Sequence, residues 1–312
     1  MRLDLITGQG ARLLLTRHWQ GCPRRHIARK VTRMSALSEF IQHHPRLAVL
    51  TGAGVSTSSG IPDYRDEQGE WKRARPVEFR PFMTRRDVRQ RYWARSTVGW
   101  PVIAQAQPNA AHCALAQLES MGFIELLITQ NVDGLHTAAG SRKVIDLHGR
   151  LELVRCMQCE STLPRAELQE RLLADNPTWA DVPARIAPDG DVDVERDFSE
   201  FLVPDCPECG GILKPDVVFF GENVPRERVA RAFEGVTEAD ALLVVGTSLM
   251  VYSGFRFAEA AAAAGKPIAA VNLGRTRADH LIALKIGATA DEVLNEVNQA
   301  FQRERRAKLR VN

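Results

Sequence analysis

Residues 47–54 read Leu47-Ala48-Val49-Leu50-Thr51-Gly52-Ala53-Gly54. Four consecutive apolar residues are typical of a short strand that is covered on both faces. The two glycines after it would let backbone amides approach a pyrophosphate, and residues 55–59 could begin a helix whose N-terminus favours an anion. Thr57 replaces the third glycine of the dinucleotide-binding fingerprint, so a plain strand–turn–helix corner is an open alternative. A P-loop is excluded because no Gly-Lys-Ser/Thr follows.

Similar apolar runs recur along the chain and alternate with helical patterns. We expect further strands at residues 124–129, 144–147, 217–220, 241–245 and 268–271. We expect helices at residues 109–121, 226–236, 255–264 and 291–305. Strand–helix alternation of this kind predicts an α/β fold, a mostly parallel sheet with right-handed crossovers.

Two segments interrupt the alternation. Residues 67–104 are rich in arginine, aromatic residues and proline, and predict a helical and loop insert. Residues 151–210 hold two pairs of cysteines. We therefore predict a Rossmann-like parallel sheet domain built from residues 34–150 and 211–305. A small zinc-ribbon domain would be inserted at residues 151–210, and residues 306–312 would form a tail.

The paired cysteines are Cys156, Cys159, Cys206 and Cys209. Two residues between the members of a pair let both thiolates turn toward one metal ion, and four thiolates leave no open position for water, so a zinc ion here would be structural. A redox dithiol or four unrelated core cysteines are the alternatives. A zinc-ribbon nucleic-acid binder is disfavoured because the segment is acidic; its acids include Asp189, Asp191, Asp193, Glu195 and Asp197.

Small and polar residues follow several of the expected strands. Ligands of open parallel sheets bind beyond the carboxyl ends of the strands, so these residues would meet at one edge. They are Gln130-Asn131-Val132-Asp133, His148, Gly246-Thr247-Ser248 and Asn272-Leu273-Gly274. Thr247, Ser248 and Asn272 could bind ribose or phosphate. His148 has a pKa near neutrality and could face the cleft, although a lone histidine is often a structural hydrogen-bonding group.

The motifs resemble those of the sirtuins, the NAD-dependent protein deacylases, from about residue 36 to residue 300. In family order they are Gly52-Ala53-Gly54-Val55-Ser56, Gly60-Ile61-Pro62-Asp63-Tyr64-Arg65, Thr129-Gln130-Asn131-Val132-Asp133-Gly134-Leu135-His136, His148-Gly149, the four cysteines, Lys214-Pro215-Asp216-Val217-Val218-Phe219-Phe220-Gly221-Glu222 and Gly246-Thr247-Ser248-Leu249. Other stretches resemble the class II branch, which includes a mitochondrial member: Arg91-Tyr92-Trp93-Ala94-Arg95, Gly99-Trp100-Pro101, Asn176-Pro177-Thr178-Trp179 and Ala187-Pro188-Asp189-Gly190-Asp191.

The resemblance implies an enzyme that uses NAD to remove acyl groups from protein lysines, releasing nicotinamide and O-acyl-ADP-ribose, with a structural zinc ion. It makes His148 the general base, and Gln130, Asn131 and Asp133 the holders of the nicotinamide ribose and a water. Asp63, with Ile61 and Pro62, would contact the nicotinamide amide, Tyr64 would screen the reactive ribose carbon, and Arg65 would orient loop and phosphates. The remaining NAD contacts would be Gly52, Ala53, Gly54, Ser56, Gly246, Thr247, Ser248, Asn272, Leu273, Gly274 and Ala290.

The resemblance also implies that acylated-lysine protein substrates are bound by strand addition. The segment that would pair with them includes Val218, Phe219, Gly221 and Glu222. Sirtuins that remove succinyl or malonyl groups carry a tyrosine and an arginine in the acyl pocket, and no convincing pair stands out among the arginines of residues 73–86. Larger acyl groups (branched, hydroxylated or lipoyl), lipoamide cleavage or protein ADP-ribosyl transfer are the alternatives. The loop near Pro188 could enter the acyl channel.

Composition sets the outer limits on function. Hydrophobic residues make up 45% and charged residues 25%, with a net charge of +3. These values exclude a disordered chain, and a charge so near balance does not indicate nucleic-acid binding. The apolar runs are too short to span a membrane. A nicotinamide dehydrogenase is the rival enzyme class.

The first 33 residues carry eight basic side chains and one acid. They could be a mitochondrial transit peptide, a disordered basic tail or the product of an unnatural start site. We expect a cytoplasmic protein, or a protein of the mitochondrial matrix if the segment is a transit peptide.

Overall fold

The computed structural model describes residues 33–72, 76–180, 182, 185–186, 192–194 and 196–311. The expected basic N-terminal extension, with the question of a transit peptide, lies outside these residues, as does the loop around Pro188. Within the described part of the chain, no helix is both long and apolar enough to cross a bilayer.

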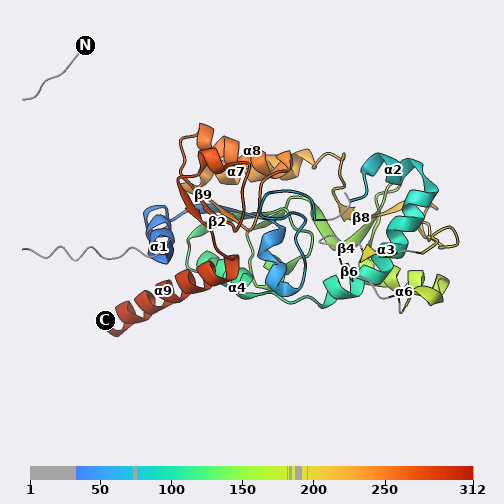
Figure 1. Ribbon diagram of the computed structural model, residues 1–312, viewed down its shortest axis with the longest axis horizontal. Helices are drawn as coiled ribbons and strands as arrows, with labels where there is room; N and C mark the ends of the chain where they lie inside the picture. Colours follow the sequence, from blue (N-terminus) through green and yellow to red (C-terminus); the bar gives the residue numbers. More distant parts are fainter. Residues whose placement is uncertain are drawn as a thin grey trace, which may run out of the picture. The chain divides into compact units, whose positions relative to one another are not determined.

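A six-stranded parallel sheet forms the larger part of the fold (Figure 1), with the strand order β11-β10-β9-β1-β2-β3. Its strands are β1 (Leu47–Thr51), β2 (Ile124–Thr129), β3 (Val144–Asp146), β9 (Ala241–Val245), β10 (Ile268–Val271) and β11 (Leu284–Ile286). Strand β1 pairs with β2 on one side and with β9 on the other, so it lies in the middle of the sheet. The expected Rossmann-like α/β fold is confirmed.

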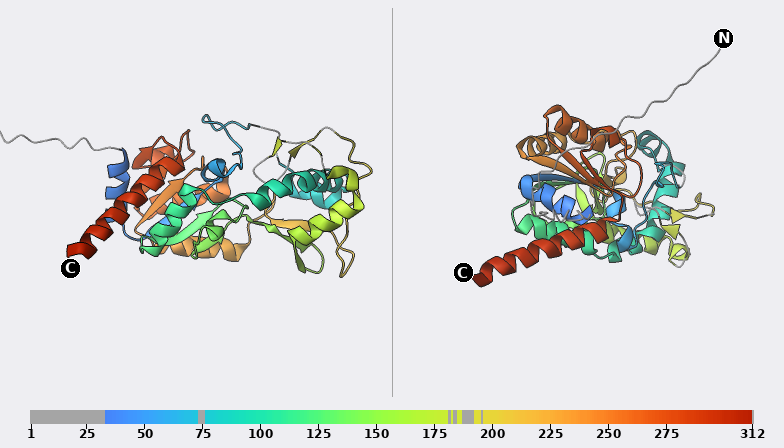
Figure 2. Two further views of the ribbon diagram at one scale, coloured as in Figure 1. Left: turned by 90° about the horizontal axis from the view of Figure 1, so that it is seen from below. Right: turned by 60° about the vertical axis from the view of Figure 1, so that its left-hand side comes forward.

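Helices cover both faces of this sheet (Figures 1 and 2). One face carries α1 (Arg33–His43), α4 (Ala110–Ser120) and α9 (Ala290–Val311), and the other carries α7 (Arg226–Glu238) and α8 (Tyr252–Ala263). Leu47 and Val49 belong to the core on the first face, whereas Ala48 and Leu50 belong to the core on the second. Side chains of a strand point alternately to its two faces, so a doubly covered strand needs the unbroken apolar run of residues 47–50.

A second region packs around its own core. It contains the three-stranded antiparallel sheet β5-β4-β8, formed by β4 (Gly149–Cys156), β5 (Thr162–Pro164) and β8 (Leu213–Val217), and the two-stranded sheet of β6 (Arg185–Ile186) and β7 (Val192–Asp193). Its helices are α2 (Phe79–Thr84), α3 (Arg86–Gln105), α5 (Leu135–Ala138) and α6 (Arg165–Asp175). Phe82, Trp93, Leu172 and Phe201 are among the fully buried residues of this core.

Several expected elements differ from those observed. The strand expected at residues 217–220 is wrong, because β8 covers residues 213–217 and pairs with β4 instead of joining the parallel sheet. The apolar run continues past Val217 because Phe219 packs against Phe82 and Tyr92, with ring centroids 5.1 and 5.2 Å apart.

The expected helix at residues 55–59 is also wrong. Two short 3-10 turns, η1 (Ala53–Val55) and η2 (Thr57–Ser59), take its place. Two further 3-10 turns are η3 (Pro177–Trp179) and η4 (Asp279–Leu281). Helix α8 begins three residues earlier than expected, α9 continues to Val311, and α1 and β11 were not anticipated.

Candidate active site and metal centre

A cavity of about 520 Å³ lies at the carboxyl ends of β1, β2 and β9 and is bounded on the other side by residues 217–222. This volume suits a small-molecule ligand. The structure brings together all of the expected site residues outside the metal centre except Pro62, which does not line the cavity. They are Gly52, Ala53, Gly54, Ser56, Ile61, Asp63, Tyr64, Arg65, Gln130, Asn131, Asp133, His148, Val218, Phe219, Gly221, Glu222, Gly246, Thr247, Ser248, Asn272, Leu273, Gly274 and Ala290.

The floor of the cavity is formed by two loops whose backbones touch. The amide of Gly54, after β1, donates a hydrogen bond of 2.8 Å to the carbonyl of Gly246, after β9. A Cβ atom on Gly54 would lie 2.8 Å from that carbonyl oxygen, and a Cβ atom on Gly246, whose φ is +58°, would lie 2.5 Å from the amide nitrogen of Val55. Glycine is therefore required at both positions, because any side chain would collide with the backbone of the other loop. The resulting side-chain-free floor is the kind of surface that a pyrophosphate can approach, so the cavity fits NAD.

Ser56 links the two polar residues that follow β2. Its hydroxyl donates to Oδ2 of Asp133 at 2.7 Å and accepts from Nδ2 of Asn131 at 3.0 Å. The other carboxylate oxygen, Oδ1 of Asp133, accepts from the amide of Leu135 at 3.0 Å. These bonds fix the orientation of Asn131 and Asp133 before any ligand binds.

Two buried histidines lie next to this network. His136 belongs to a motif named above but was given no role, and His112 was not anticipated. The ring centroids of His112 and His136 are 4.7 Å apart, Nδ1 of His112 lies 2.8 Å from Oδ1 of Asn109, and Nε2 of His136 lies 2.9 Å from Oγ1 of Thr51. Burial lowers the pKa of both rings, that of His136 strongly. Both rings are neutral at pH 7. Their hydrogen bonds hold the C-terminal end of β1 and the N-terminal end of α4 in place. The capping box formed by Asn109 and His112 is the sequence signal that could have found one of them.

His148 is held by one hydrogen bond at each ring nitrogen. Nδ1 lies 2.9 Å from the carbonyl oxygen of Gln130, and Nε2 lies 2.8 Å from Oγ of Ser253. A carbonyl only accepts, so Nδ1 carries the proton and Nε2 is the basic nitrogen. Burial, with a smaller contribution from the charges of Arg228 and Arg256, lowers the pKa of His148 to about 4, and the hydrogen bond to Gln130 opposes this shift.

The ring of His148 is therefore neutral at pH 7 and has the proton acceptor that a general base needs. Ser253, the partner of that acceptor, was not anticipated from the sequence. Its place at the start of α8, shortly after the expected Gly246-Thr247-Ser248 loop, is the one available signal.

The loop at residues 63–72 forms one wall of the cavity. Nζ of Lys72 pairs with Oδ1 of Asp63 at 2.5 Å, and Nη1 of Arg65 donates to the carbonyl of Gly69 at 2.6 Å. The guanidinium of Arg65 stacks on Trp71, with 4.0 Å between Cζ and the ring centroid. Trp71 and Lys72 also line the cavity and were not anticipated. Arg65 thus contacts both the backbone and a ring of this loop, and its expected role in orienting the loop and the phosphates stays a prediction.

The expected peptide-binding segment is anchored to His148 and to a buried lysine. The amide of Val218 donates to the carbonyl of His148 at 2.7 Å, and the amide of Phe219 donates to Oε2 of Glu222 at 2.9 Å. The same carboxylate oxygen accepts from Nζ of Lys214 at 3.1 Å. Lys214 also donates to the carbonyls of Pro215 and Val217, at 3.3 and 2.5 Å. The carboxylate of Glu222 thus links the backbone of the segment at residues 218–222 to the buried side chain of Lys214.

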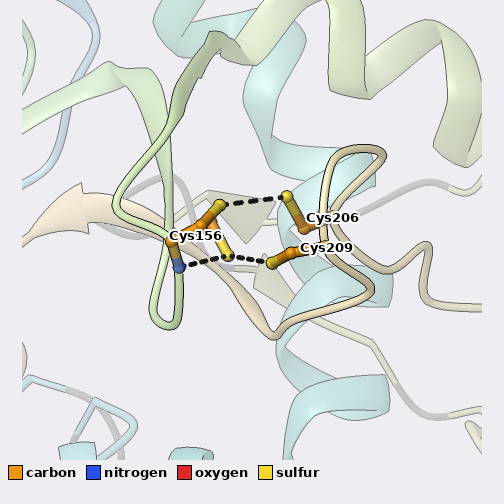
Figure 3. Close-up of side chains that lie close together, drawn as sticks. Cys156, Cys206 and Cys209 are labelled. Carbon is orange, nitrogen blue, oxygen red and sulfur yellow. Dashed lines mark hydrogen bonds between the residues drawn. The ribbon is translucent and has the colours of Figure 1, made fainter.

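The four expected zinc ligands come together at the far ends of β4 and β8. The sulfurs of Cys156, Cys159, Cys206 and Cys209 all lie within 4.8 Å of one another. Figure 3 shows three of them, labelled, converging from two loops. The Sγ atoms of Cys156 and Cys209 are 3.5 Å apart, and those of Cys159 and Cys206 are 3.8 Å apart.

Four thiolates about 2.3 Å from a zinc ion at the centre of a tetrahedron lie roughly 3.8 Å from one another, so the cluster fits zinc. The ligand set is complete without water, which makes the metal structural. The amides of Gln158 and Cys159 point to Sγ of Cys156 at 3.4 and 3.5 Å, as amides around metal-bound thiolates do.

Comparisons with known proteins agree with this geometry. The Sir2 family matches residues 52–253. An NAD-dependent protein deacetylase of Xanthomonas campestris is 63% identical over 265 residues, covering 85% of this chain and 90% of that protein. One of the same name from Bordetella bronchiseptica is 61% identical over 269 residues, covering 86% and 98%.

Solved structures show the same fold. A structure named "Sir2-p53 peptide-NAD+" superimposes with a TM-score of 0.70 at 31% identity, covering 86% of this chain and 98% of that chain. A structure named "Structure of Sir2Tm bound to a propionylated peptide" gives a TM-score of 0.69 at 31% identity, covering 87% and 99%. With a family match over residues 52–253 and relatives above 60% identity, the chain belongs to the Sir2 family.

Proposed function

We propose that the protein is an NAD-dependent protein lysine deacetylase. The observation that carries the proposal is the position of His148. His148 lines a cavity that has a glycine floor on one side and the segment at residues 218–222 on the other, and its Nε2 is unprotonated. A neutral base between a dinucleotide site and a peptide site is the arrangement that the reaction needs.

Bound NAD supplies an electrophilic ribose carbon with nicotinamide as its leaving group. The side chains of Asn131 and Asp133, which Ser56 holds in place, would bind the ribose and a water. Asp63 and Ile61 contact the nicotinamide end, and Tyr64 keeps bulk water from the reactive carbon. Nε2 of His148 would accept the proton of a ribose hydroxyl once nicotinamide has left. That oxygen could then bond to the acyl carbon, and with one water the acyl C–N bond would break and release the lysine amine.

The substrate peptide lies as an added strand between residues 218–222 and the loop that follows Ser248. Both segments line the cavity, and strand addition reads the peptide main chain. The acyl group of the lysine points toward the apolar side chains of Ile61, Tyr92, Val217 and Phe219, which also line the cavity. This lining favours acetyl and other uncharged acyl groups. The relatives from Xanthomonas and Bordetella are named deacetylases, which supports the choice of acetyl.

The test is a panel of peptides that carry acetyl-, propionyl-, succinyl-, glutaryl- and lipoyl-lysine, incubated with the purified full chain and NAD. We expect release of nicotinamide and of the free lysine peptide, seen by mass spectrometry, with the acetyl and propionyl peptides turned over fastest. We expect His148→Ala to bind NAD as the wild type does and to lose about 10²–10⁴-fold in turnover.

Three results of this panel would contradict the proposal. Formation of the reduced cofactor without nicotinamide release would indicate a dehydrogenase. Transfer of ADP-ribose to protein with every peptide left acylated would indicate a transferase. Wild-type turnover by His148→Ala would overturn the role of the base.

A further inference from the structure

Three side chains that the mechanism above does not use form a cationic rim where α8 begins. The cationic rim consists of Tyr252, Arg256 and Arg277. Cζ of Arg256 lies 5.3 Å from the centroid of the Tyr252 ring, and Cζ of Arg277 lies 5.7 Å from the same centroid. Tyr252 is 54% exposed, and both Tyr252 and Arg256 line the cavity. The rim is thus a partly open surface that continues the cavity.

Among the described residues, no carboxylate forms an ion pair with Arg256. Its Nε atom is buried and has no hydrogen-bond partner, and no carboxylate in the described part of the chain pairs with Arg256 or Arg277. A buried guanidinium N–H without an acceptor costs free energy, and it gains most from a charged acceptor. Arg277 is held in place by its stacking on Phe255, 4.3 Å from the ring centroid, and by donation from Nη1 to the carbonyl of Met250 at 3.3 Å.

The acids that line the same cavity do not form ion pairs with the rim. Glu222 pairs with Lys214 and Asp63 with Lys72. The carboxylates of Asp133 and Asp66 accept hydrogen bonds from Ser56 and from backbone amides near them, and Glu67 forms no ion pair with a residue of the described chain. The charges of Arg256 and Arg228 both act on His148, so the positive field extends to the reacting end of the cavity. An anion is therefore the ligand that this surface suits.

The position of the rim indicates which anion binds there. Residues 249–252 line the cavity together with residues 218–222, and the proposed function places the substrate peptide between these two segments. Tyr252 is the last residue of the first segment, at the start of α8. A side chain next to the acylated lysine would leave the added strand at this point and reach Tyr252 and Arg256.

We infer that the cationic rim binds an acidic side chain that flanks the acylated lysine, so that the enzyme selects acidic substrate peptides. The carboxylate accepts hydrogen bonds from the guanidinium groups of Arg256 and Arg277, and its methylene groups pack on the ring of Tyr252. This inference rests on the proposed function and adds a substrate preference to it. A charge-assisted bond of this kind corresponds to about a tenfold preference.

The test uses the full chain, NAD and acetyl-lysine peptides of one parent sequence, in which each position next to the lysine is in turn Glu, Gln or Lys. Nicotinamide release gives kcat and KM for each peptide. We expect one position at which kcat/KM for Glu exceeds that for Gln by about tenfold and that for Lys by more, with a preference that weakens in high salt. In Arg256→Gln the three peptides at that position should become equivalent, through KM. Arg303→Gln, the same change at an exposed residue of α9, should keep the wild-type preference.

A charge reversal separates recognition from damage to the fold. Arg256→Glu should favour the Lys peptide over the Glu peptide, which a merely unfolded or loosened variant would not do. The inference is overturned if Glu, Gln and Lys peptides react alike at every position in the wild type. It is also overturned if Arg256→Gln raises the KM for NAD and leaves the peptide preference intact, because the arginine would then serve the pyrophosphate. Inactivity on every acetylated peptide would instead contradict the proposed deacetylase function itself.

Discussion

The hydroxyl of Ser253 lies 2.8 Å from Nε2 of His148, the nitrogen that has to accept the substrate proton. Because Nδ1 donates to the carbonyl of Gln130, the serine hydroxyl donates to Nε2. In the proposed reaction a ribose hydroxyl would have to give its proton to the same nitrogen, Nε2. The hydroxyl of Ser253 fixes the orientation of the His148 ring and stabilises its unprotonated form.

Replacing this hydroxyl should therefore change the pH dependence of the reaction. A hydrogen bond to the neutral ring favours the neutral form, so Ser253→Ala should raise the pKa of His148. The acid limb of the kcat/KM profile should move toward neutral pH by about one pH unit, which corresponds to a typical hydrogen bond. Ser253→Thr keeps a hydroxyl and should keep the wild-type profile. Superimposable acid limbs for wild type and Ser253→Ala would contradict this role.

Burial of His148 should make the protein less stable in acid. Its pKa is about 4 in the folded protein and about 6.5 when exposed, so below pH 6.5 the unfolded chain binds the extra proton. The stabilisation is complete above about pH 6.5 and is lost as the pH falls toward 4. Between pH 6.5 and pH 5 the loss is about 2 kcal/mol.

Urea unfolding at a series of pH values measures this effect on the free energy of unfolding. His148→Gln cannot titrate and should lose less stability over the same interval. Burial of His136 acts in the same direction, so some acid sensitivity should remain in that variant. Equal acid slopes for the two proteins would show that the proton uptake occurs elsewhere.

The ion pair between Lys214 and Glu222 should be needed for peptide binding as well as for stability. The side chains are 5% and 19% exposed, so Lys214→Met leaves a largely buried carboxylate without its cation. The expected cost is roughly 3–5 kcal/mol, together with a raised KM for the peptide, because Glu222 holds the amide of Phe219.

The double variant Lys214→Met/Glu222→Gln removes both charges and should recover part of the lost stability. A thermodynamic cycle built from the two single variants and the double variant measures the coupling. Additive losses of the two single variants would contradict a direct link between the side chains.

Removal of zinc should abolish turnover, although the metal site does not border the cavity. Strand β4 runs from Gly149, next to His148, to Cys156, and its partner β8 leads to Val218. Chelation of the wild type should lower the melting temperature and abolish turnover, and added zinc should restore both. Cys209→Ser should contain less zinc and should stay inactive when zinc is added. Metal content by atomic absorption checks the assignment, and full activity of a metal-free protein would contradict it.

The parts of the molecule that local sequence specifies could be predicted. Strands β2, β9 and β10 have the bounds that were expected from the sequence. The spacing of the cysteines was enough to identify the four metal ligands. The strand expected at residues 217–220 failed because an apolar run does not show whether its side chains face a sheet core or a cavity.

Contacts between distant parts of the chain could not be predicted from the sequence, for a different reason. His148 and Ser253 are 105 positions apart, and nothing in the sequence around either one indicates the other. Arg256 lies inside both the expected helix and the observed α8, but its place on the cavity wall depends on how α8 packs against the rest of the fold. Partners of this kind follow from how the strands are ordered in the sheet, which a single sequence leaves open.

The contact between Gly54 and Gly246 limits how the nucleotide preference of this protein could be redesigned. Any side chain at either position would push the first and ninth strands apart, so neither can serve to reshape the pocket. Leu273 borders the same cavity and is 57% exposed, which leaves it free to vary. Libraries aimed at altered dinucleotide analogues should therefore randomise the loop that follows β10 and keep Gly54 and Gly246 fixed.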